Sequence, residues 1–429
     1  MTEPGMLPAS GIGPKPSYPV EREEGDITQS YGAARLISVD YFSPCVRMGL
    51  QTAVALDSAS LLHRAHVDIC LPPGKRARAL RRVVGRRAAN RVVPGIAPDR
   101  IHNHPQLAVV ARLRRRLLLA GRDTTVVDRM LSQMFRAIAR QCDSAAVVGT
   151  QSSCLELFDG RTFRIMEQVS PPLRYERTVA AEELARFRGW APEGVAKPRP
   201  WDHRMEAEWQ EADLIWVPSR HLINISADFG ADATKFRVIP YPVRPVPYMS
   251  RTKSLGSRRK LQVIFAGTLM LEKGVQYIYQ ALRNRSNLPV TVDFYGSANL
   301  APLGLRRLSE VGTIHGPVPR TELFHKFLNA DLLLFPSLSE GSALVTLEAA
   351  ALGLPVVATE DAGPSASAML IAPRSPEAIS EALERLIDYR DHLESMSAAG
   401  LAETANRTAS RYSMSIVNSI RSLSRRPVA

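Results

Sequence analysis

Short apolar runs alternate with amphipathic stretches along most of this chain. This alternation is typical of α/β proteins with parallel sheets, because each parallel strand needs a crossover, usually a helix, before the next strand. In the first half, apolar runs predict strands at 34–39, 67–71, 145–149, 163–169, 214–218 and 236–239. Helical periodicity predicts helices at 49–63, 178–187 and 201–212, and a break at 42–44.

The same alternation restarts after Lys260. Strands are expected at 261–265, 291–295, 313–315, 332–335 and 355–358, and helices at 274–282, 343–352 and 376–387. Four prolines within 240–247, followed by a basic run to Lys260, are typical of an interdomain linker. We therefore expect two doubly wound α/β domains facing one cleft, with a ligand at the carboxyl ends of the strands.

Composition narrows the class of protein. Of the 429 residues, 45% are hydrophobic and 23% are charged, which excludes a mostly disordered or fibrous chain. The four cysteines are too dispersed for a metal or redox motif and too few for a disulfide scaffold. No stretch approaches the roughly 20 apolar residues that cross a bilayer. The first 30 residues indicate a disordered arm rather than a signal peptide, so we expect a cytoplasmic protein.

The net charge of +13 is concentrated in one segment. Residues 64–122 contain fifteen Lys and Arg but only Asp68 and Asp99 as acids, a surplus equal to the whole net charge. Such a block favours attraction to a polyanion, and its lack of Phe, Tyr and Trp makes nucleic acid the least favoured partner. The preferred interpretation is that this segment binds the anionic surface at the inner face of the membrane. The alternative that it is only a solvated basic face stays open. One basic row has helical spacing: Lys75, Arg78, Arg82 and Arg86.

The most informative stretch is 331–359. A buried strand leads into a polar loop with Glu340 and Gly341, and the helix that follows carries Glu348. A helix N-terminus offers unpaired N–H groups and partial positive charge, which suit a phosphate. Eight residues of helix rise roughly 12 Å, so the two glutamates can contact opposite ends of an elongated ligand whose phosphates lie between them. The structural alternative is that Glu348 is only a solvated helix residue.

A second piece supports this hypothesis. In 265–274, Lys273 lies between the end of a strand and the start of a helix. A lysine at such a turn is a natural counter-charge for a leaving diphosphate, although surface lysines before helices are common.

Together these residues resemble the retaining GT-B glycosyltransferases of family 4, also called glycosyl transferases group 1. The resemblance rests on an E-x7-E element (Glu340 and Glu348), on the Ala-Leu-Gly-Leu-Pro-Val-Val-Ala-Thr that follows it, and on a Gly-x5-Lys-Gly turn (Gly267, Lys273 and Gly274). A weaker likeness lies in 206–219 and 236–243. Specific motifs cover about a third of the chain.

The resemblance implies an α/β protein with the GT-B fold, two Rossmann-like domains facing one interdomain cleft. It implies an N-terminal arm (1–30), an acceptor domain (31–245), a linker (246–259), a nucleotide-sugar-binding domain (260–404) and a helical tail (405–429) that packs back on the first domain. It further implies a hexosyltransferase that uses a UDP- or GDP-linked sugar as substrate and needs no cofactor. The basic segment at 64–122 adds the expectation that the acceptor is a saccharide or lipid-linked saccharide in cell-surface polysaccharide synthesis.

The resemblance also implies roles for individual residues. Glu348 would bind the ribose and Lys273 the diphosphate, while Glu340 and Lys273 would be the catalytic residues. The implied donor-binding residues are Gly267, Thr268, Lys273, Gly341, Ser342, Ala343, Leu344 and Glu348. Gly49 and Gln151 are candidates for the acceptor side, and Gly296 and Gly316 either line the base pocket or only form turns.

Some positions depart from the family pattern. Thr268 stands where the family usually has Arg, and Thr150-Gln151 ends a strand where the family has a His that faces the donor sugar. His102 and His104 lie in what reads as a loop. These departures leave open a non-catalytic sugar-nucleotide or polyanion-binding protein on a degenerate GT-B frame. No D-x-D triplet occurs, so we expect no metal at the donor site.

Overall fold

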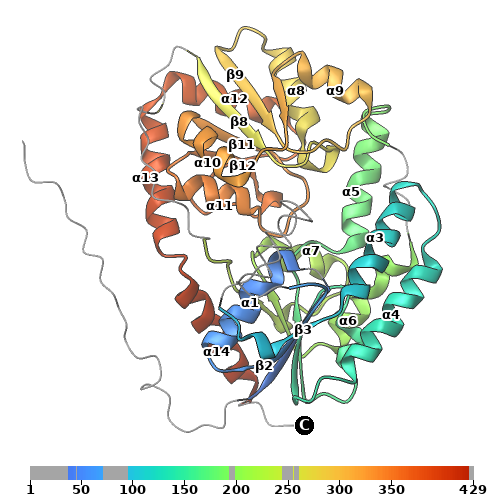
Figure 1. Ribbon diagram of the computed structural model, residues 1–429. Helices are drawn as coiled ribbons and strands as arrows, with labels where there is room; N and C mark the ends of the chain where they lie inside the picture. Colours follow the sequence, from blue (N-terminus) through green and yellow to red (C-terminus); the bar gives the residue numbers. More distant parts are fainter. Residues whose placement is uncertain are drawn as a thin grey trace, which may run out of the picture. The chain divides into compact units, whose positions relative to one another are not determined.

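The computed structural model describes residues 37–44, 46–70, 95–192, 199–243, 255 and 260–424. The described chain forms one seven-stranded and one six-stranded sheet, and every strand pair in both sheets is parallel (Figure 1). The prediction of two parallel α/β domains is therefore confirmed. The N-terminal arm, most of the linker and the basic row from Lys75 to Arg86 lie outside the described residues.

The first sheet has the strand order β3-β2-β1-β4-β5-β6-β7. Its strands are β1 (Val39–Ser43), β2 (Leu62–Val67), β3 (Ile101–Asn103), β4 (Ala146–Thr150), β5 (Phe163–Glu167), β6 (Leu214–Val217) and β7 (Phe236–Val238). Every residue of β1, β4 and β6 is buried, because helices cover both faces of the sheet.

The helices of this half are α1 (Val46–Ser58), α3 (Pro105–Leu119), α4 (Thr125–Ala139), α5 (Leu173–Arg186), α6 (Arg204–Glu211) and α7 (His221–Asp228). Short 3-10 helices are η3 (Pro98–Arg100), η4 (Leu155–Leu157), η6 (Pro200–His203) and η7 (Ala233–Lys235). One core contains Leu56 of α1, and a second contains Phe135 of α4 and Trp209 of α6.

The second sheet has the order β10-β9-β8-β11-β12-β13. Its strands are β8 (Leu261–Ala266), β9 (Val290–Tyr295), β10 (Thr313–Gly316), β11 (Leu332–Phe335), β12 (Val356–Thr359) and β13 (Met369–Ile371). Phe265 is central to its core, with its ring centroid 5.6 Å from that of Phe335 and 6.0 Å from that of Phe294.

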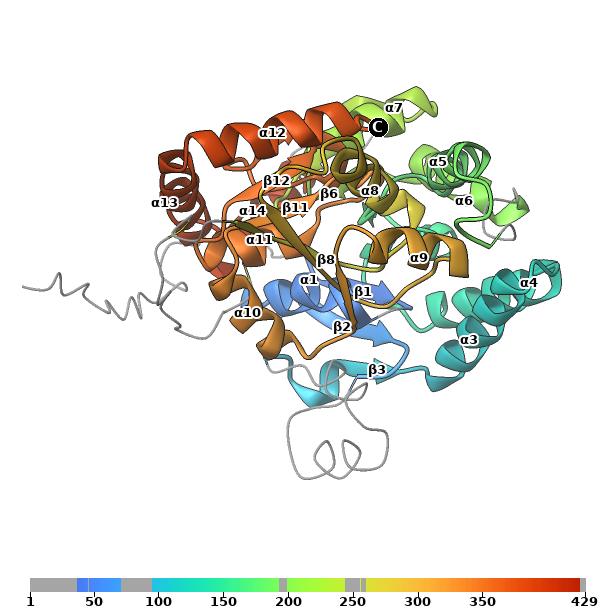
Figure 2. The same ribbon diagram turned by 90° about the horizontal axis from the view of Figure 1, so that it is seen from above.

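Helices cover this sheet as well. They are η8 (Leu271–Lys273), α8 (Val275–Asn284), α9 (Pro302–Ser309), α10 (Arg320–Asn329), α11 (Leu344–Ala351), η9 (Glu360–Ala362), α12 (Pro376–Asp388) and α13 (Asp391–Ala405). α8 packs against α9 and α12, and α11 packs against α13 (Figures 1 and 2). From β8 the chain adds β9 and β10 on one side, and it then returns to add β11, β12 and β13 on the other side. The carboxyl ends of the neighbouring strands β8 and β11 are therefore the topological switch point of this sheet.

The last helix, α14 (Ala409–Ser424), packs against α1 of the first half (Figure 1). The Tyr412 hydroxyl lies 2.8 Å from Oγ1 of Thr52, which donates a 2.6 Å hydrogen bond to Glu167 at the end of β5. Ile416 is fully buried in the same core. The end of the chain therefore completes the core of the first domain. None of the helices in the described part of the chain has the length and apolar character to cross a membrane.

Several predicted boundaries at the start of the fold are wrong. Of the strand predicted at 34–39, residues 34–36 lie outside the described residues and only Val39 lies in a strand. That strand continues to Ser43, and Phe42 and Ser43 are buried inside it instead of breaking it. α1 ends at Ser58 and β2 begins at Leu62, so the strand predicted at 67–71 lies five residues too late. Ser60 ends the turn with a left-handed φ of 58°, after which Leu62 returns to the core.

Three further elements differ from the prediction. His102 lies in β3, opposite His66 of β2, and not in a loop. α5 begins at Leu173, directly after Pro172 and five residues before the predicted helix start. The predicted helix 201–212 is split into η6 and α6.

Candidate functional site

The turn after β8 is hydrogen-bonded to the loop after β11. The backbone oxygen of Glu272 accepts hydrogen bonds from the Leu338 N–H (2.8 Å) and the Ser337 hydroxyl (3.2 Å). Nζ of Lys273 donates to the backbone oxygen of Ser339 at 2.9 Å. The carboxyl ends of two neighbouring strands at the switch point thus form one surface.

Lys273 and Glu340 form an ion pair on this surface. Nζ of Lys273 lies 2.6 Å from Oε1 of Glu340, and the two side chains are 17% and 27% exposed. They are open enough for a ligand to reach, yet buried enough for their charges to be weakly screened. The structure therefore brings together the two residues expected to be catalytic, and an anionic ligand here would compete with Glu340 for the ammonium group.

Glycines allow the close approach of these segments. Gly274 ends η8 with φ 71°, and a Cβ there would lie 2.0 Å from the backbone oxygen of Pro336. A Cβ on Gly296 would lie 1.8 Å from the backbone oxygen of Gly267, which gives this glycine a packing role. Gly316 adopts φ 75° in open space, as a turn residue does.

Glu348 lies in the second turn of α11 and is paired with Arg320, the first residue of α10. Nε and Nη2 of Arg320 are 2.9 and 2.8 Å from the same oxygen, Oε1 of Glu348. The Glu348 side chain is only 13% exposed, so it is not a freely solvated helix residue. Arg320 was not foreseen, because no sequence pattern connects it with a residue 28 positions away.

The N-terminus of α11 lies between Glu340 and Glu348. Its N-cap, Ala343, donates its own N–H to Ala362 at 2.9 Å, and no side chain caps the first turn. Ser342 and Leu344 are partly exposed at this helix end. Across the surface, the Thr268 hydroxyl lies 3.4 Å from that of Ser297, and Thr268 is partly exposed. This arrangement can accept phosphate oxygens at a helix N-terminus beside Lys273.

Residues of the first domain meet the same loop. The Ser219 hydroxyl donates a 2.5 Å hydrogen bond to the backbone oxygen of Gly341, and Nε2 of His221 lies 2.7 Å from that of Glu340. A Cβ on Gly341 would lie 1.8 Å from the backbone oxygen of Val169. Ser219 ends the weakly family-like stretch 206–219, which is the only sequence signal for this contact.

Glu176 on α5 is a third carboxyl group near the ion pair that the sequence did not reveal. Its neighbour Tyr175 donates to the backbone oxygen of Leu338 at 3.3 Å, which brings the start of α5 to the loop. Burial raises the pKa of Glu176 to about 7, an effect that Lys273 opposes and Glu340 strengthens. A single acidic residue in a helix gives no signal of such a position.

The two acceptor-side candidates follow strands of the first sheet. Gln151 follows β4, and its Oε1 accepts hydrogen bonds from the N–H groups of Val169 and Ser170 at 2.6 and 2.8 Å. Its Nε2 donates a hydrogen bond to the Ser170 hydroxyl at 2.7 Å. Its amide therefore braces the segment that contacts Gly341. Gly49 lies near the start of α1.

His102 and His104 belong to a histidine cluster at the β2 and β3 edge, in which His66 and His104 are buried and His102 is partly exposed. Nδ1 of His66 lies 3.1 Å from Nε2 of His104, and the His66 and His102 ring centroids are 5.1 Å apart. Burial lowers the pKa of His66 to about 4 and also lowers that of His104. Among the residues that the structure describes, no three His, Cys, Asp or Glu side chains form a group that could hold a metal ion.

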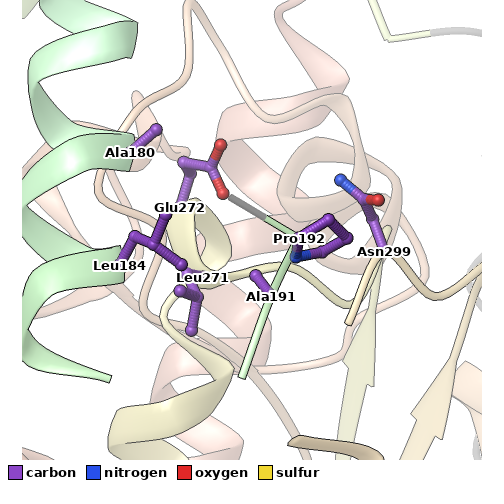
Figure 3. A pocket seen from close by; sticks show the side chains of 7 residues that line it. All are labelled: Ala180, Leu184, Ala191, Pro192, Leu271, Glu272 and Asn299. Carbon is purple, nitrogen blue, oxygen red and sulfur yellow. The ribbon is translucent and has the colours of Figure 1, made fainter. Parts of the chain in front are cut away.

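A small cavity lies beside the Lys273 turn, between α5 and η8 (Figure 3). Its volume of about 10 Å³ is close to that of a single water, so it is too small for a substrate. The Glu272 side chain extends into this space, and burial raises the pKa of its carboxyl group. The lining residues are Ala180, Leu184, Ala191, Pro192, Leu271, Glu272 and Asn299.

Comparison with known proteins agrees with this geometry. Residues 260–389 match the model of the family Glycosyl transferases group 1. The chain is 32% identical over 127 residues to a putative teichuronic acid biosynthesis glycosyltransferase, TuaC, of Bacillus subtilis, which is 28% of this chain and 32% of that protein. It is 35% identical over 134 residues to a D-inositol 3-phosphate glycosyltransferase of Streptomyces griseus, which is 28% of each chain. The chain thus spans about a third or less of these relatives' own length.

The architecture also matches a solved structure. Anabaena HepE, whose crystal structure contains UDP and glucose, superposes with a TM-score of 0.56 at 13% sequence identity, covering 90% of this chain and all of that one. Together with the two parallel sheets, this similarity shows that the chain has the GT-B fold, as expected.

Proposed function

We propose that the protein is a glycosyltransferase that moves a sugar from a nucleotide-sugar donor to a saccharide or lipid-linked acceptor. The proposal rests mainly on the Lys273–Glu340 ion pair at the switch point. This pair lies next to the N-terminus of α11, which no side chain caps, and Glu340 precedes Glu348 by eight residues. The family match at 260–389 covers the same residues and supports the proposal, as does the UDP and glucose in HepE.

In the proposed donor complex, the diphosphate binds the ammonium group of Lys273 and N–H groups at the N-terminus of α11. Glu348 accepts hydrogen bonds from the ribose hydroxyls. The acceptor oxygen forms a bond to the anomeric carbon as the bond from that carbon to the diphosphate oxygen breaks. The acceptor proton passes to the departing diphosphate. Charge on the leaving group is stabilised by Lys273 and the helix N-terminus.

Retention of anomeric configuration is part of the proposal and follows from the resemblance to family 4. The donor is proposed to be UDP- or GDP-linked, and the product to belong to a cell-surface polysaccharide. We further propose that transfer needs no metal, since Lys273 supplies the counter-charge that a metal would otherwise supply. Undiminished transfer in excess EDTA would support this point, and metal-reversible loss would refute it.

The test is incubation with a panel of UDP- and GDP-sugars and saccharide acceptors, with release of the nucleoside diphosphate and the product's anomeric NMR signal as readouts. Transfer that keeps the donor's configuration is the expected result. Nucleotide binding without transfer from any donor would instead favour the second candidate, a sugar-nucleotide-binding protein, which the Thr268 substitution favours. Transfer with inversion would refute retention alone.

We also propose that the enzyme binds the anionic surface on the inner face of the membrane. On α3, Val109 is 69% exposed and Leu113 is 45% exposed, beside the exposed Arg112, Arg115 and Arg116. Apolar and basic side chains together suit the boundary between headgroups and acyl chains.

The expected result is sedimentation with vesicles that contain phosphatidylglycerol but not with neutral vesicles. It should be lost in R112E/R115E/R116E and kept in a control with three reversed charges in the other domain, R283E/R285E/R306E. Absence of vesicle binding by the unmodified protein would refute the proposal and indicate that the basic face is only solvated. Salt-sensitive retention on duplex DNA without vesicle binding would indicate that the partner is a nucleic acid.

A further inference from the structure

The first domain has a surface cavity of about 610 Å³ that is broadly open to solvent and is lined by none of the residues of the proposed donor site. α4 forms one wall, η6 forms another with Trp201 and His203, and Leu155 of η4 and Arg204 of α6 complete the lining. This volume lies within the range of pockets that hold small organic ligands.

The α4 wall carries two arginines on one face of the helix. Arg129 and Arg136 are exposed and seven residues apart, with Ser132 between them, so they lie about 10 Å apart along the helix axis. The one acidic side chain of the lining, Asp128, is paired with Arg114 at 2.5 Å and accepts a hydrogen bond from Thr124 at 2.8 Å. The wall therefore offers net positive charge.

The opposite side of the cavity is held rigidly. Arg204 is 8% exposed and is bound to both Glu156 and Glu208, so its positive charge is already taken up by carboxylates of the protein. Its guanidinium carbon lies 4.8 Å from the centroid of the Trp201 ring, and that of Arg114 lies 5.2 Å from it. These contacts fix the indole as a wall and leave Arg129 and Arg136 as the arginines available to a ligand.

We propose that this cavity binds a segment of an acidic saccharide chain. Guanidinium groups match carboxylate and phosphate oxygens in geometry, and two separate guanidinium groups on one wall can each bind one anionic group of the same saccharide chain. The lining hydroxyl of Ser132 and amide of Gln133 can bond to sugar hydroxyls. That the ligand is a saccharide rests on the proposed transferase function, whereas the need for anionic groups follows from the cavity itself.

The cavity is connected to the donor site by one loop. Glu208, which pairs with Arg204, accepts the N–H groups of Ser152 at 2.7 Å and Cys154 at 3.0 Å. The same loop carries Gln151, which braces the segment that contacts Gly341. A saccharide chain bound in the cavity is therefore held on the same support as the proposed acceptor side.

The test is a fluorescence titration of the full chain at 0.15 M salt with labelled oligogalacturonate, phosphorylated oligomannose and neutral dextran oligomers. We expect an acidic oligomer to bind and dextran not to bind. The better of the two acidic oligomers identifies the anionic group. R129Q/R136Q should weaken binding at least tenfold, whereas R112Q/R115Q, with the same charge change on α3, should change it less than twofold.

Equal loss in both double variants, equal binding of dextran or no binding of either acidic oligomer would overturn the proposal. Binding of UDP or GDP to R129Q/R136Q should equal that of the unmodified protein, because the donor site lies on the other sheet. A protein that binds the acidic oligomer but no nucleotide would refute the transferase proposal and leave the anionic site in place.

Discussion

Glu176 links the charge of the proposed donor site to pH. Its pKa of about 7 means that it ionises near neutrality, next to the lysine that is proposed to bind the diphosphate. An ionised Glu176 repels the diphosphate, so donor affinity should fall as pH rises from 6 to 8. Glu176→Gln should remove most of that fall, which titration of the nucleotide at both pH values will measure. The same pH dependence in the variant would show that Glu176 does not act on the donor.

Glu167 should affect stability rather than donor binding. Burial raises its pKa from the ordinary 4.5 to about 7, although Thr52 and Tyr41 donate hydrogen bonds that oppose the shift. The folded protein therefore binds more protons than the unfolded chain between these pH values, and the free energy of unfolding falls as pH rises through them.

Glu167→Gln removes this contribution. Its stability relative to the unmodified protein should therefore rise by roughly 3 kcal/mol between pH 4.5 and 8. Urea denaturation at several pH values will measure it, with the exposed Glu322→Gln as a control that shows no such trend. A pH-independent difference for Glu167→Gln would contradict the assignment.

The residues of the proposed donor site and its surroundings divide into two groups by how far the sequence predicts their positions. Lys273, Glu340 and Glu348 belong to local motifs whose spacing sets their positions on a turn and a helix. Arg320 and His221 act through contacts with residues 28 and 119 positions away, and no local pattern encodes such a contact. The ion pair between Lys273 and Glu340 likewise depends on the pairing of β8 with β11.

Among the elements, α5 belongs to the first domain yet is bonded to the second. The Glu183 carboxylate is fully buried and accepts hydrogen bonds from Gln276 (2.8 Å), Tyr277 (2.7 Å) and Arg374 (2.7 Å). Removing one partner of a buried ion pair typically costs about 3 to 5 kcal/mol.

Glu183→Ala should therefore lower the free energy of unfolding by about 3 kcal/mol or more, measured by denaturant titration. Glu182 is a matched control, because its carboxylate pairs with the same Arg374 at 2.6 Å but is 45% exposed. Exposed pairs contribute about 0 to 1 kcal/mol, so Glu182→Ala should have little effect. Equal losses in both variants would contradict the structural role of Glu183.

Elements with continuous apolar runs were predicted well. The prediction of β11 is without error, and that of β12 is within one residue at each end, because both strands contain a continuous apolar run and are buried throughout. The prediction of α11, which lies between them, is also within one residue at each end. β2 and β3 were misplaced or missed. Their sequences, LHRAHV and IHN, contain histidines that read as polar, and only the tertiary fold buries His66.

At the scale of the whole molecule, the chain's last helix stabilises its first domain. Ile416 of α14 is fully buried in the core that contains Leu56 of α1. Ile416→Ala should lower the free energy of unfolding by about 2 to 5 kcal/mol, as truncation of a buried isoleucine does. Met414→Ala on the same helix is the control, since Met414 is 50% exposed and its loss should cost about 0.5 kcal/mol or less. Similar effects of the two changes would contradict the packing of α14.

Calorimetric titration of UDP and GDP tests whether a nucleotide-sugar donor binds between Lys273 and Glu348, as we propose. One of the two nucleotides should bind the unmodified protein. Lys273→Ala and Glu348→Ala should each weaken that binding by about 1 to 3 kcal/mol, the range for a lost hydrogen bond to a charged group. The exposed Lys260→Ala, which removes the same charge from the same domain, should leave it unchanged. Unchanged nucleotide affinity in both Lys273→Ala and Glu348→Ala would show that the donor does not bind between these residues.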